Sequence, residues 1–158
     1  MTVNIICVGK IKEDYFVRAS AEFEKRLSRF CTFNVIQLPD KSIPDNPSEA
    51  ECREVLQKEG EAILKKIGRG DIAIALCIEG NQLSSEQLAQ KLNQFMMQGS
   101  TIDFIIGGSL GLSEEVKNRA DFRLSMSAMT FPHRIARIML EEQIYRAFKI
   151  NANETYHK

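Results

Sequence analysis

The chain has 158 residues, of which 44% are hydrophobic and 27% are charged, and its 21 basic residues balance 21 acidic ones. A chain of this length fits a single domain over residues 1–158 and can bury about 70% of the surface that its unfolded form exposes. The formal net charge of zero argues against a protein that relies on a strong basic field to bind nucleic acid.

The charges are unevenly distributed along the chain. Residues 40–61 include seven acidic and three basic side chains, whereas residues 132–158 include five basic and three acidic ones. A polyanion should therefore approach the carboxy-terminal end. The amino-terminal residues lack the pattern of a secretory signal, and no apolar run approaches the ~18 residues of a membrane span. We therefore expect a cytoplasmic protein that does not enter a membrane.

Four cysteines and two histidines are present, far apart from one another. Their spacing predicts neither a disulfide framework nor a metal site. Cys7 and Cys77 lie within apolar runs, so we expect them to be buried as small hydrophobic residues.

The first half of the chain alternates strands with amphipathic helices. The apolar run over residues 3–8 predicts a strand, and hydrophobic residues at helical spacing predict a helix over residues 12–30. A second strand over residues 33–38 is followed by a loop that contains two prolines. Ser48 and Glu51 form the pattern of a capping box, which opens a helix that stops at Gly68.

The second half continues this alternation. The apolar run over residues 71–78 is typical of a central parallel strand covered on both faces, and Gly80 is expected to turn the chain. Five further elements follow: a helix capped by Ser84, a strand over residues 101–106, a short helix capped by Ser113, a brief strand over residues 122–125, and a helix over residues 132–150 with Pro132 in its first position. Strands that alternate with helices predict an α/β fold with a mainly parallel sheet flanked by helices.

The last predicted helix has two apolar faces. Ile135 and Ile138 point one way on a helical wheel, while Leu140, Ile144 and Phe148 point nearly opposite. One face can pack on the sheet, and the other needs a second cover. A symmetric homodimer would supply that cover, and so would a helix buried deeply within its own chain.

A glycine-rich stretch over residues 107–111 follows the fourth strand. Ligands of open α/β sheets bind beyond the carboxyl ends of the strands, and glycine lets a ligand approach the backbone closely. The stretch matches neither the dinucleotide-binding nor the phosphate-binding glycine pattern, which argues against a nucleotide-dependent oxidoreductase. It is therefore either a binding turn of another kind or a plain tight turn.

The segment over residues 126–131 follows the fifth strand and is apolar and hydroxyl-bearing. Such a loop can enclose a flat heteroaromatic ring, although a plain connection has the same composition. His133 comes directly after it, in a position that is either structural or functional. Arg146 could meet a phosphate group, or it could pair with Glu142 on the face of the helix.

Several runs of residues occur in this order in a known family of enzymes. They are Val8-Gly9-Lys10 near the amino terminus, residues 104–109, residues 129–133, residues 142–147 and the closing Tyr156-His157-Lys158. Together they resemble the RlmH family of the SPOUT methyltransferases, and the resemblance extends over the whole chain.

The resemblance implies S-adenosylmethionine-dependent methylation at N3 of a pseudouridine in a 23S ribosomal RNA stem-loop on the assembled ribosome. It also implies a SPOUT-type fold with a carboxy-terminal trefoil knot, and a homodimer. The cofactor positions that it implies are Leu76, Gly107, Met126, Ser127, Ala128, Met129, Thr130 and Phe131.

The reaction suggests roles for further residues. N3 of a uracil-type base is protonated at neutral pH, so its proton must leave, and His133 is our candidate for assisting that loss. Arg137, Arg146, Tyr156 and His157 are expected to contact the RNA. The alternative hypothesis is a non-catalytic ribosome- or RNA-binding module that uses the same loops.

Overall fold

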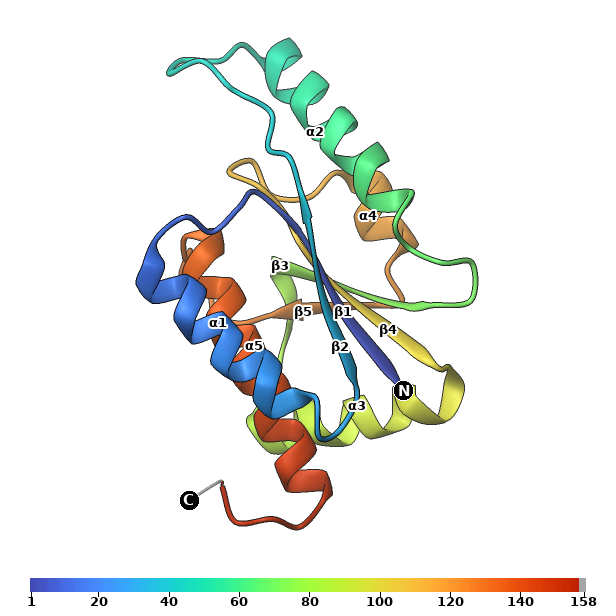
Figure 1. Ribbon diagram of the computed structural model, residues 1–158. Helices are drawn as coiled ribbons and strands as arrows, with labels where there is room; N and C mark the ends of the chain where they lie inside the picture. Colours follow the sequence, from blue (N-terminus) through green and yellow to red (C-terminus); the bar gives the residue numbers. More distant parts are fainter. Residues whose placement is uncertain (157–158) are drawn as a thin grey trace.

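The apolar runs form a five-stranded sheet in which neighbouring strands are parallel, in the order β2-β1-β4-β3-β5 (Figure 1). The computed structural model describes residues 1–156. The predicted α/β fold with a mainly parallel sheet is confirmed, and β4 lies at its centre. The strands are β1 (Thr2–Val8), β2 (Thr32–Leu38), β3 (Ile72–Gln82), β4 (Thr101–Ile106) and β5 (Phe122–Ser125).

Five helices follow the strands, and their start signals are largely those that the sequence predicts. At both Ser48 and Ser84 the hydroxyl accepts a backbone hydrogen bond from the third helical residue, whose side chain bonds back to the cap. Pro132 precedes the last helix instead of opening it, because its backbone is extended and its carbonyl accepts the first helical bond, from Ala136. The helices are α1 (Asp14–Leu27), α2 (Glu49–Leu64), α3 (Ser85–Gln98), α4 (Glu114–Arg119) and α5 (His133–Asn151).

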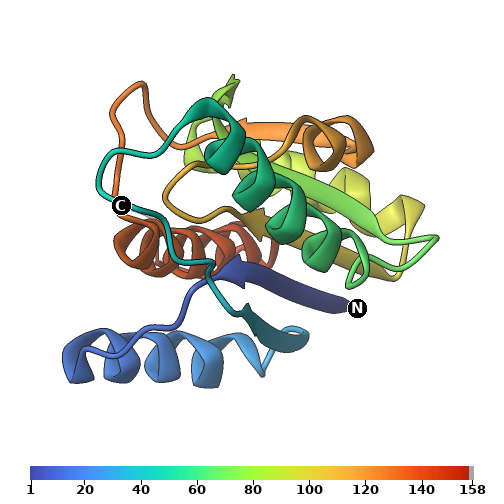
Figure 2. The same cartoon turned by 90° about the horizontal axis from the view of Figure 1, so that it is seen from above.

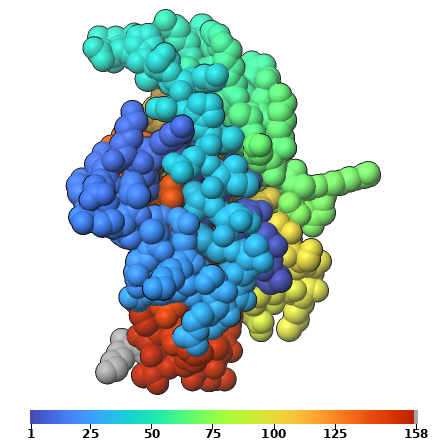
Figure 3. Space-filling model, viewed as in Figure 1, coloured from blue at the N-terminus to red at the C-terminus, as the bar shows by residue number. Residues whose placement is uncertain are grey.

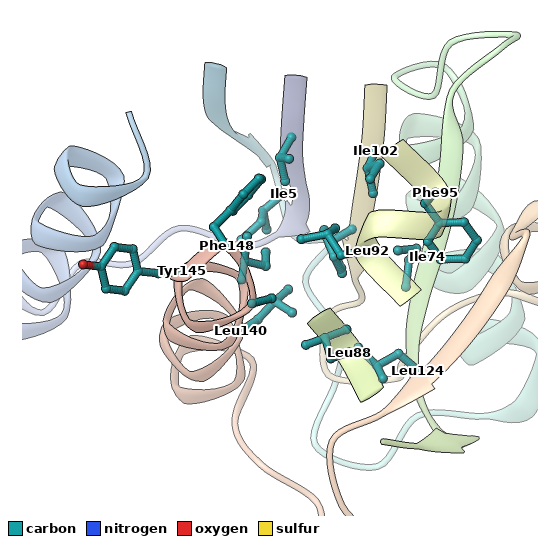
Figure 4. Close-up of a cluster of buried hydrophobic side chains, with 14 of the residues drawn as sticks. Ile5, Ile74, Leu88, Leu92, Phe95, Ile102, Leu124, Leu140, Tyr145 and Phe148 are labelled. Atoms are coloured by element: carbon teal, nitrogen blue, oxygen red, sulfur yellow. The ribbon is translucent and has the colours of Figure 1, made fainter. Parts of the chain in front are cut away.

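None of the helices in the described part of the chain combines the length and the apolar character that a membrane span requires. They instead form two layers on the sheet, with α1, α3 and α5 on one face and α2 and α4 on the other. Figure 4 shows the larger core, where Leu140 and Phe148 of α5 point toward Ile5 of β1, and Leu92 of α3 lies between α5 and Ile74 of β3. Burying one such side chain contributes about 1.5–3 kcal/mol.

Helix α5 packs against both α1 and α3, which explains one of its two apolar faces (Figure 2). Leu140 and Ile144 on that face are fully buried. On the other face Ile135 is 39% exposed, and Ile138 is half-buried. The chain itself therefore covers the second apolar face only in part.

The first half of α2 and the loop before it project from the body of the molecule as an arm, residues 39–58 (Figure 3, cyan to teal). Every residue of the arm is exposed or half-buried. The second half of the helix is anchored on the sheet, where Glu59, Gly60 and Ile63 are buried. The helix is therefore held by its carboxyl-terminal turns alone.

Strand β3 continues past the point where the sequence predicts a turn. Leu76 and Asn81 both pair with Leu124 of β5, so the residues between them bulge out of the ladder. A Cβ on Gly80 would stand 2.7 Å from the carbonyl carbon of Leu124, so glycine here permits a close approach of the two strands and does not turn the chain. Cys77 lies in this bulge and is half-buried, whereas Cys7 is buried as predicted.

A row of polar side chains crosses three strands at one register. Nδ2 of Asn34 donates to Oδ1 of Asn4 over 2.9 Å, and Nδ2 of Asn4 donates to Oδ1 of Asp103 over 2.7 Å. Asp103 is fully buried, and within residues 1–156 its Oδ2 accepts no hydrogen bond. Burial raises the pKa of Asp103 from its usual 3.8 to about 6, against the opposing effect of the Asn4 hydrogen bond. At neutral pH the folded chain therefore holds an unfavourable buried charge.

The variant Asp103→Asn should be more stable than the wild type at about pH 8. Its free energy of unfolding should be larger by roughly 1–3 kcal/mol, since one pKa unit corresponds to about 1.4 kcal/mol. Below the unfolded pKa the carboxyl is neutral in both states, so the advantage disappears there, and the wild type loses this stability as the pH rises from about 4 to about 6. Denaturant unfolding at about pH 8 and at a pH below the unfolded pKa of about 4 measures the difference. The control is Asp45→Asn, at an exposed position. Equal stabilities of the wild type and Asp103→Asn at about pH 8 would contradict this prediction, because they would show that the Asp103 charge does not destabilise the folded chain.

Candidate functional site

A cavity of about 790 Å³ lies at the carboxyl edge of the sheet. Three segments supply most of its wall: the bulge of β3, the turn after β4 and the loop after β5. The glycine-rich stretch over residues 107–111 and the segment over residues 126–131, which the sequence singled out, therefore converge on one cavity. Because the strands are parallel, their carboxyl ends meet at one edge, and loops far apart in sequence come together there.

The turn after β4 depends on a close contact between two backbone segments. A Cβ on Gly107 would stand 2.3 Å from the carbonyl oxygen of Gly111, and the Gly111 N–H donates to the Gly108 carbonyl over 3.0 Å. Gly111 has a φ of +81°, which favours glycine. The turn therefore presents backbone, with little side chain, to the cavity, and backbone amides can recognise a polar ligand edge.

The loop after β5 is organised by two serines. The hydroxyl of the buried Ser125 donates to the Ser127 carbonyl over 3.1 Å, and the Ser127 hydroxyl accepts the Met129 N–H over 3.0 Å. These bonds fold the loop back over the cavity. All but one of the expected cofactor positions line the cavity; the exception, Ala128, is exposed. The lining positions are Leu76, Gly107, Met126, Ser127, Met129, Thr130 and Phe131.

His133, the first residue of α5, also lines the cavity. Its Nε2 lies 3.0 Å from the position that a Cβ on Gly9 would take, and within residues 1–156 this buried atom has no hydrogen-bond partner. Burial lowers the pKa of His133, and the nearby Arg134 lowers it further, while Asp40 and Glu13 act in the opposite direction. The imidazole is therefore neutral at pH 7, and its free nitrogen can accept a proton.

The cavity also holds an ion pair that sequence reasoning did not identify. Lys117 of α4 pairs with Glu79 of the β3 bulge, and both residues line the cavity. The hydrogen bond with Lys117 lowers the pKa of Glu79, and the same bond raises the pKa of Lys117. The bulge brings Glu79 to this position, and the hydrophobic pattern alone gave no sign of a bulge.

Arg137 does not lie on the surface, where an RNA contact would require it. Its side chain is 6% exposed, its Nε donates to Glu141 over 2.9 Å, and its Nη2 donates to the Ser20 hydroxyl over 2.7 Å. Glu141 is itself fully buried, and burial raises its pKa. This placement speaks against an RNA contact from Arg137, because its guanidinium already joins α5 to α1.

Arg146 and Tyr156 form a second cluster, near the other end of α5. The Arg146 guanidinium pairs with Glu142 and lies 4.8 Å from the Tyr156 ring centroid, and the Tyr156 hydroxyl donates to Glu142 over 3.2 Å. Arg146 is thirteen positions after His133 in the helix, or about 20 Å further along α5. Within one chain this cluster is therefore remote from the cavity. His157 lies outside the described residues.

Comparisons with known proteins agree with this geometry. Residues 1–157 match the family described as "Predicted SPOUT methyltransferase". The chain is 51% identical to a "Ribosomal RNA large subunit methyltransferase H" of Clostridium novyi (strain NT), and the alignment covers 100% of both chains. A protein of the same name from Bifidobacterium animalis subsp. lactis (strain AD011) is also 51% identical over 100% of both chains.

A solved structure supports the fold. It is that of a probable methylase family protein from Haemophilus influenzae Rd KW20, with a TM-score of 0.57 and 13% identity, and the match covers 99% of this chain and 70% of that one. At this identity the likeness concerns the fold alone. The family match and the full-length relatives identify an enzyme, which leaves a non-catalytic binding module without support. The chain belongs to the SPOUT methyltransferases, in the family of the ribosomal RNA large subunit methyltransferases H.

Proposed function

We propose that this protein uses S-adenosylmethionine to methylate N3 of a pseudouridine in a 23S ribosomal RNA stem-loop on the assembled ribosome. The observation that carries the proposal is the convergence of the turn after β4 and the loop after β5 on one cavity. The relatives' names supply the class of substrate, and the resemblance supplies the base and its atom. The place of action would be the cytoplasm.

The cavity fits the cofactor in size and in chemistry. Its volume of about 790 Å³ lies in the range of small-molecule sites, which are mostly apolar with a few placed polar groups. Leu76, Met126 and Phe131 offer apolar surface for an adenine ring, and the backbone of Gly107 and of residues 126–131 offers hydrogen bonds to its edge. When bound, S-adenosylmethionine supplies an electrophilic methyl group on a sulfonium.

The residues of the chain then have two tasks. The first is positioning, since holding two reactants in line can contribute several kcal/mol to the rate. The backbone-built turn at Gly107 suits this task because it is rigid. The second is removal of the N3 proton. His133 suits this task because it lines the cavity, its surroundings keep it neutral, and its Nε2, which lies against Gly9, has no partner within residues 1–156.

The RNA would contact Arg146, near the carboxy-terminal end of α5, together with Tyr156 and His157, which follow the helix in sequence. Because Arg146 lies about 20 Å from His133 along the helix, one chain does not bring both groups to one base. A homodimer in which two copies of α5 run in opposite directions would bring the cluster of one subunit toward the cavity of the other. The partly exposed second face of α5, with Ile135 39% exposed, supports such a dimer.

A carboxy-terminal trefoil knot is also part of the proposal. The chain leaves the edge strand β5, crosses through residues 126–132, and enters α5, which packs between α1 and α3 (Figure 2). The segment shares the cavity with the turn of residues 107–111, and a knot would thread it past that turn. Knots are rare in proteins, so this path is supported by family membership together with the geometry.

Replacing Gly107 by alanine should weaken S-adenosylmethionine binding roughly tenfold or more, which corresponds to about 1.4 kcal/mol. The added Cβ collides with the Gly111 carbonyl, so the turn must open. Isothermal titration calorimetry measures the affinity. Gly70→Ala is the matched control, because a Cβ there meets no atom within 4 Å. Unchanged binding by Gly107→Ala would remove the turn from the proposed cofactor site.

The variant His133→Ala should lower the rate of methyl transfer by about 10²–10⁴-fold, the usual contribution of a general base, while cofactor affinity stays within a few-fold. The wild-type rate should also fall as the pH drops below 6.5, because the lowered pKa of His133 places its protonation there. Single-turnover transfer of labelled methyl groups to ribosomes from a strain lacking the enzyme gives both results. If the rate of His133→Ala still falls as the pH drops below 6.5, a group other than His133 accepts the N3 proton.

Free 23S RNA should be a poor substrate compared with assembled ribosomes. The chain is formally neutral, because 21 acidic side chains offset its 21 basic ones, and we expect it to make few phosphate contacts of its own. Mass spectrometry of the target nucleotide, after parallel incubations with ribosomes and with a short naked hairpin, measures the two rates. A rate on the hairpin that is comparable to the rate on ribosomes would contradict this prediction, because it would show that the enzyme recognises the hairpin RNA without the rest of the ribosome.

A further inference from the structure

Glu59 is a buried carboxylate that no step of the proposed reaction uses. It lies in the anchored half of α2 and is only 5% exposed. Its Oε1 accepts the Lys41 N–H over 3.2 Å, while its Oε2 is buried and has no hydrogen-bond partner in the described part of the chain. A carboxylate in this state is unfavourable for folding, so its position calls for an explanation.

The carboxylate lies directly behind the glycine turn of the cavity. A Cβ on Gly108 would stand 3.0 Å from Oε2 and 3.3 Å from Oε1 of Glu59, and Gly108 lines the cavity. The next residue, Gly60, packs against Ser113 at the start of α4, where a Cβ would stand 2.4 Å from the Ser113 hydroxyl oxygen. Helix α2 thus contacts the glycine turn at Gly108 and the chain just after that turn at Ser113. Only Gly108 separates the Glu59 carboxylate from the cavity.

The charge at this position is poorly compensated by its neighbours. Burial raises the pKa of Glu59, the hydrogen bond from Lys41 and the Lys41 charge oppose that rise, and the charge of Asp40 adds to it. A cation bound in the cavity would stabilise the ionised carboxylate, and by reciprocity the carboxylate would stabilise the cation. Water does not screen this interaction as it would at the surface.

We propose that Glu59 makes the cavity favour the sulfonium form of the cofactor over its demethylated product. The inference rests on the proposed function. S-adenosylmethionine and S-adenosylhomocysteine share the adenosyl and amino acid groups, so contacts to those groups bind both nearly equally. The two differ by one methyl group and one positive charge. A negative charge behind Gly108 acts on that difference: it strengthens binding of the donor, so the donor displaces the product more readily. Glu59 is a positioning and specificity residue, since it acts through the turn and not by touching the reacting atoms.

The test compares the affinities of the wild type and Glu59→Gln for S-adenosylmethionine and S-adenosylhomocysteine by calorimetry. The decisive quantity is the ratio of the product dissociation constant to the donor dissociation constant. Glu59→Gln keeps an oxygen for the Lys41 N–H but removes the charge, so the ratio should fall roughly 5- to 10-fold, mainly through weaker donor binding. Glu61→Gln is the matched control, because it removes the same charge from an exposed position on the same helix.

A ratio that is unchanged or larger in Glu59→Gln overturns the inference, as does an equal fall in Glu61→Gln. A wild type that binds neither compound overturns the proposed cofactor, and with it the inference. Removal of an unpaired buried charge should leave the thermal midpoint of Glu59→Gln at or above that of the wild type. Glu59→Met is a second neutral variant, and it should show the same fall in the ratio if the charge, and not the amide, is responsible.

Discussion

Close contact between backbone segments at the carboxyl edge of the sheet is the constraint on which the cavity depends. At Gly107 the turn after β4 folds so tightly on Gly111 that no side chain fits, and at Gly80 the bulge of β3 lies directly on β5. Both contacts bring segments from different β-α units within reach of one ligand. A larger residue at either position would separate these segments, and the cavity wall would lose the backbone groups that it presents. The site is thus built from main chain, which varies less in position than long side chains do.

Buried charge is the second feature that shapes this molecule, and it occurs in two forms. Arg137, Glu141 and Ser20 join α5 to α1 through direct hydrogen bonds, so each charge has a partner of opposite sign or a hydroxyl. This network lies one turn beyond His133, and it fixes the orientation of the helix that carries the imidazole. Glu59, like Glu141, has one oxygen without a partner in the described residues, but its other oxygen accepts only the backbone N–H of Lys41 and pairs with no guanidinium. Paired buried charges hold structure together, whereas an unpaired one lowers stability, as at Asp103. At Glu59 it is the contact with Gly108, in the cavity wall, that connects the charge with a bound ligand.

The sequence predicted the strands and most helix starts because these depend on local patterns. The order of apolar residues marks β4, and Ser84 with Gln87 marks the start of α3. The bulge at Gly80 was missed because glycine signals a turn and a close approach equally well, and only the partner strand distinguishes the two. The burial of Glu59 could have been predicted from the sequence, because this residue is four positions from both Val55 and Ile63 and so lies on the apolar face of its helix. The burial of Arg137 could not be predicted, since α1, which supplies Ser20, is distant in sequence.

The zero net charge conceals an uneven distribution of charge along the sequence. The arm, on the face covered by α2, lies within a stretch of seven acidic and three basic residues, whereas the segment that forms α5 and the residues after it carries five basic and three acidic ones. The cavity lies at the edge between these two layers. Each arginine and lysine side chain of α5 pairs with a carboxylate, so this helix offers phosphate groups only a weak attraction. A neutral protein of this kind does not bind a polyanion strongly, which agrees with the proposed reaction on the assembled ribosome.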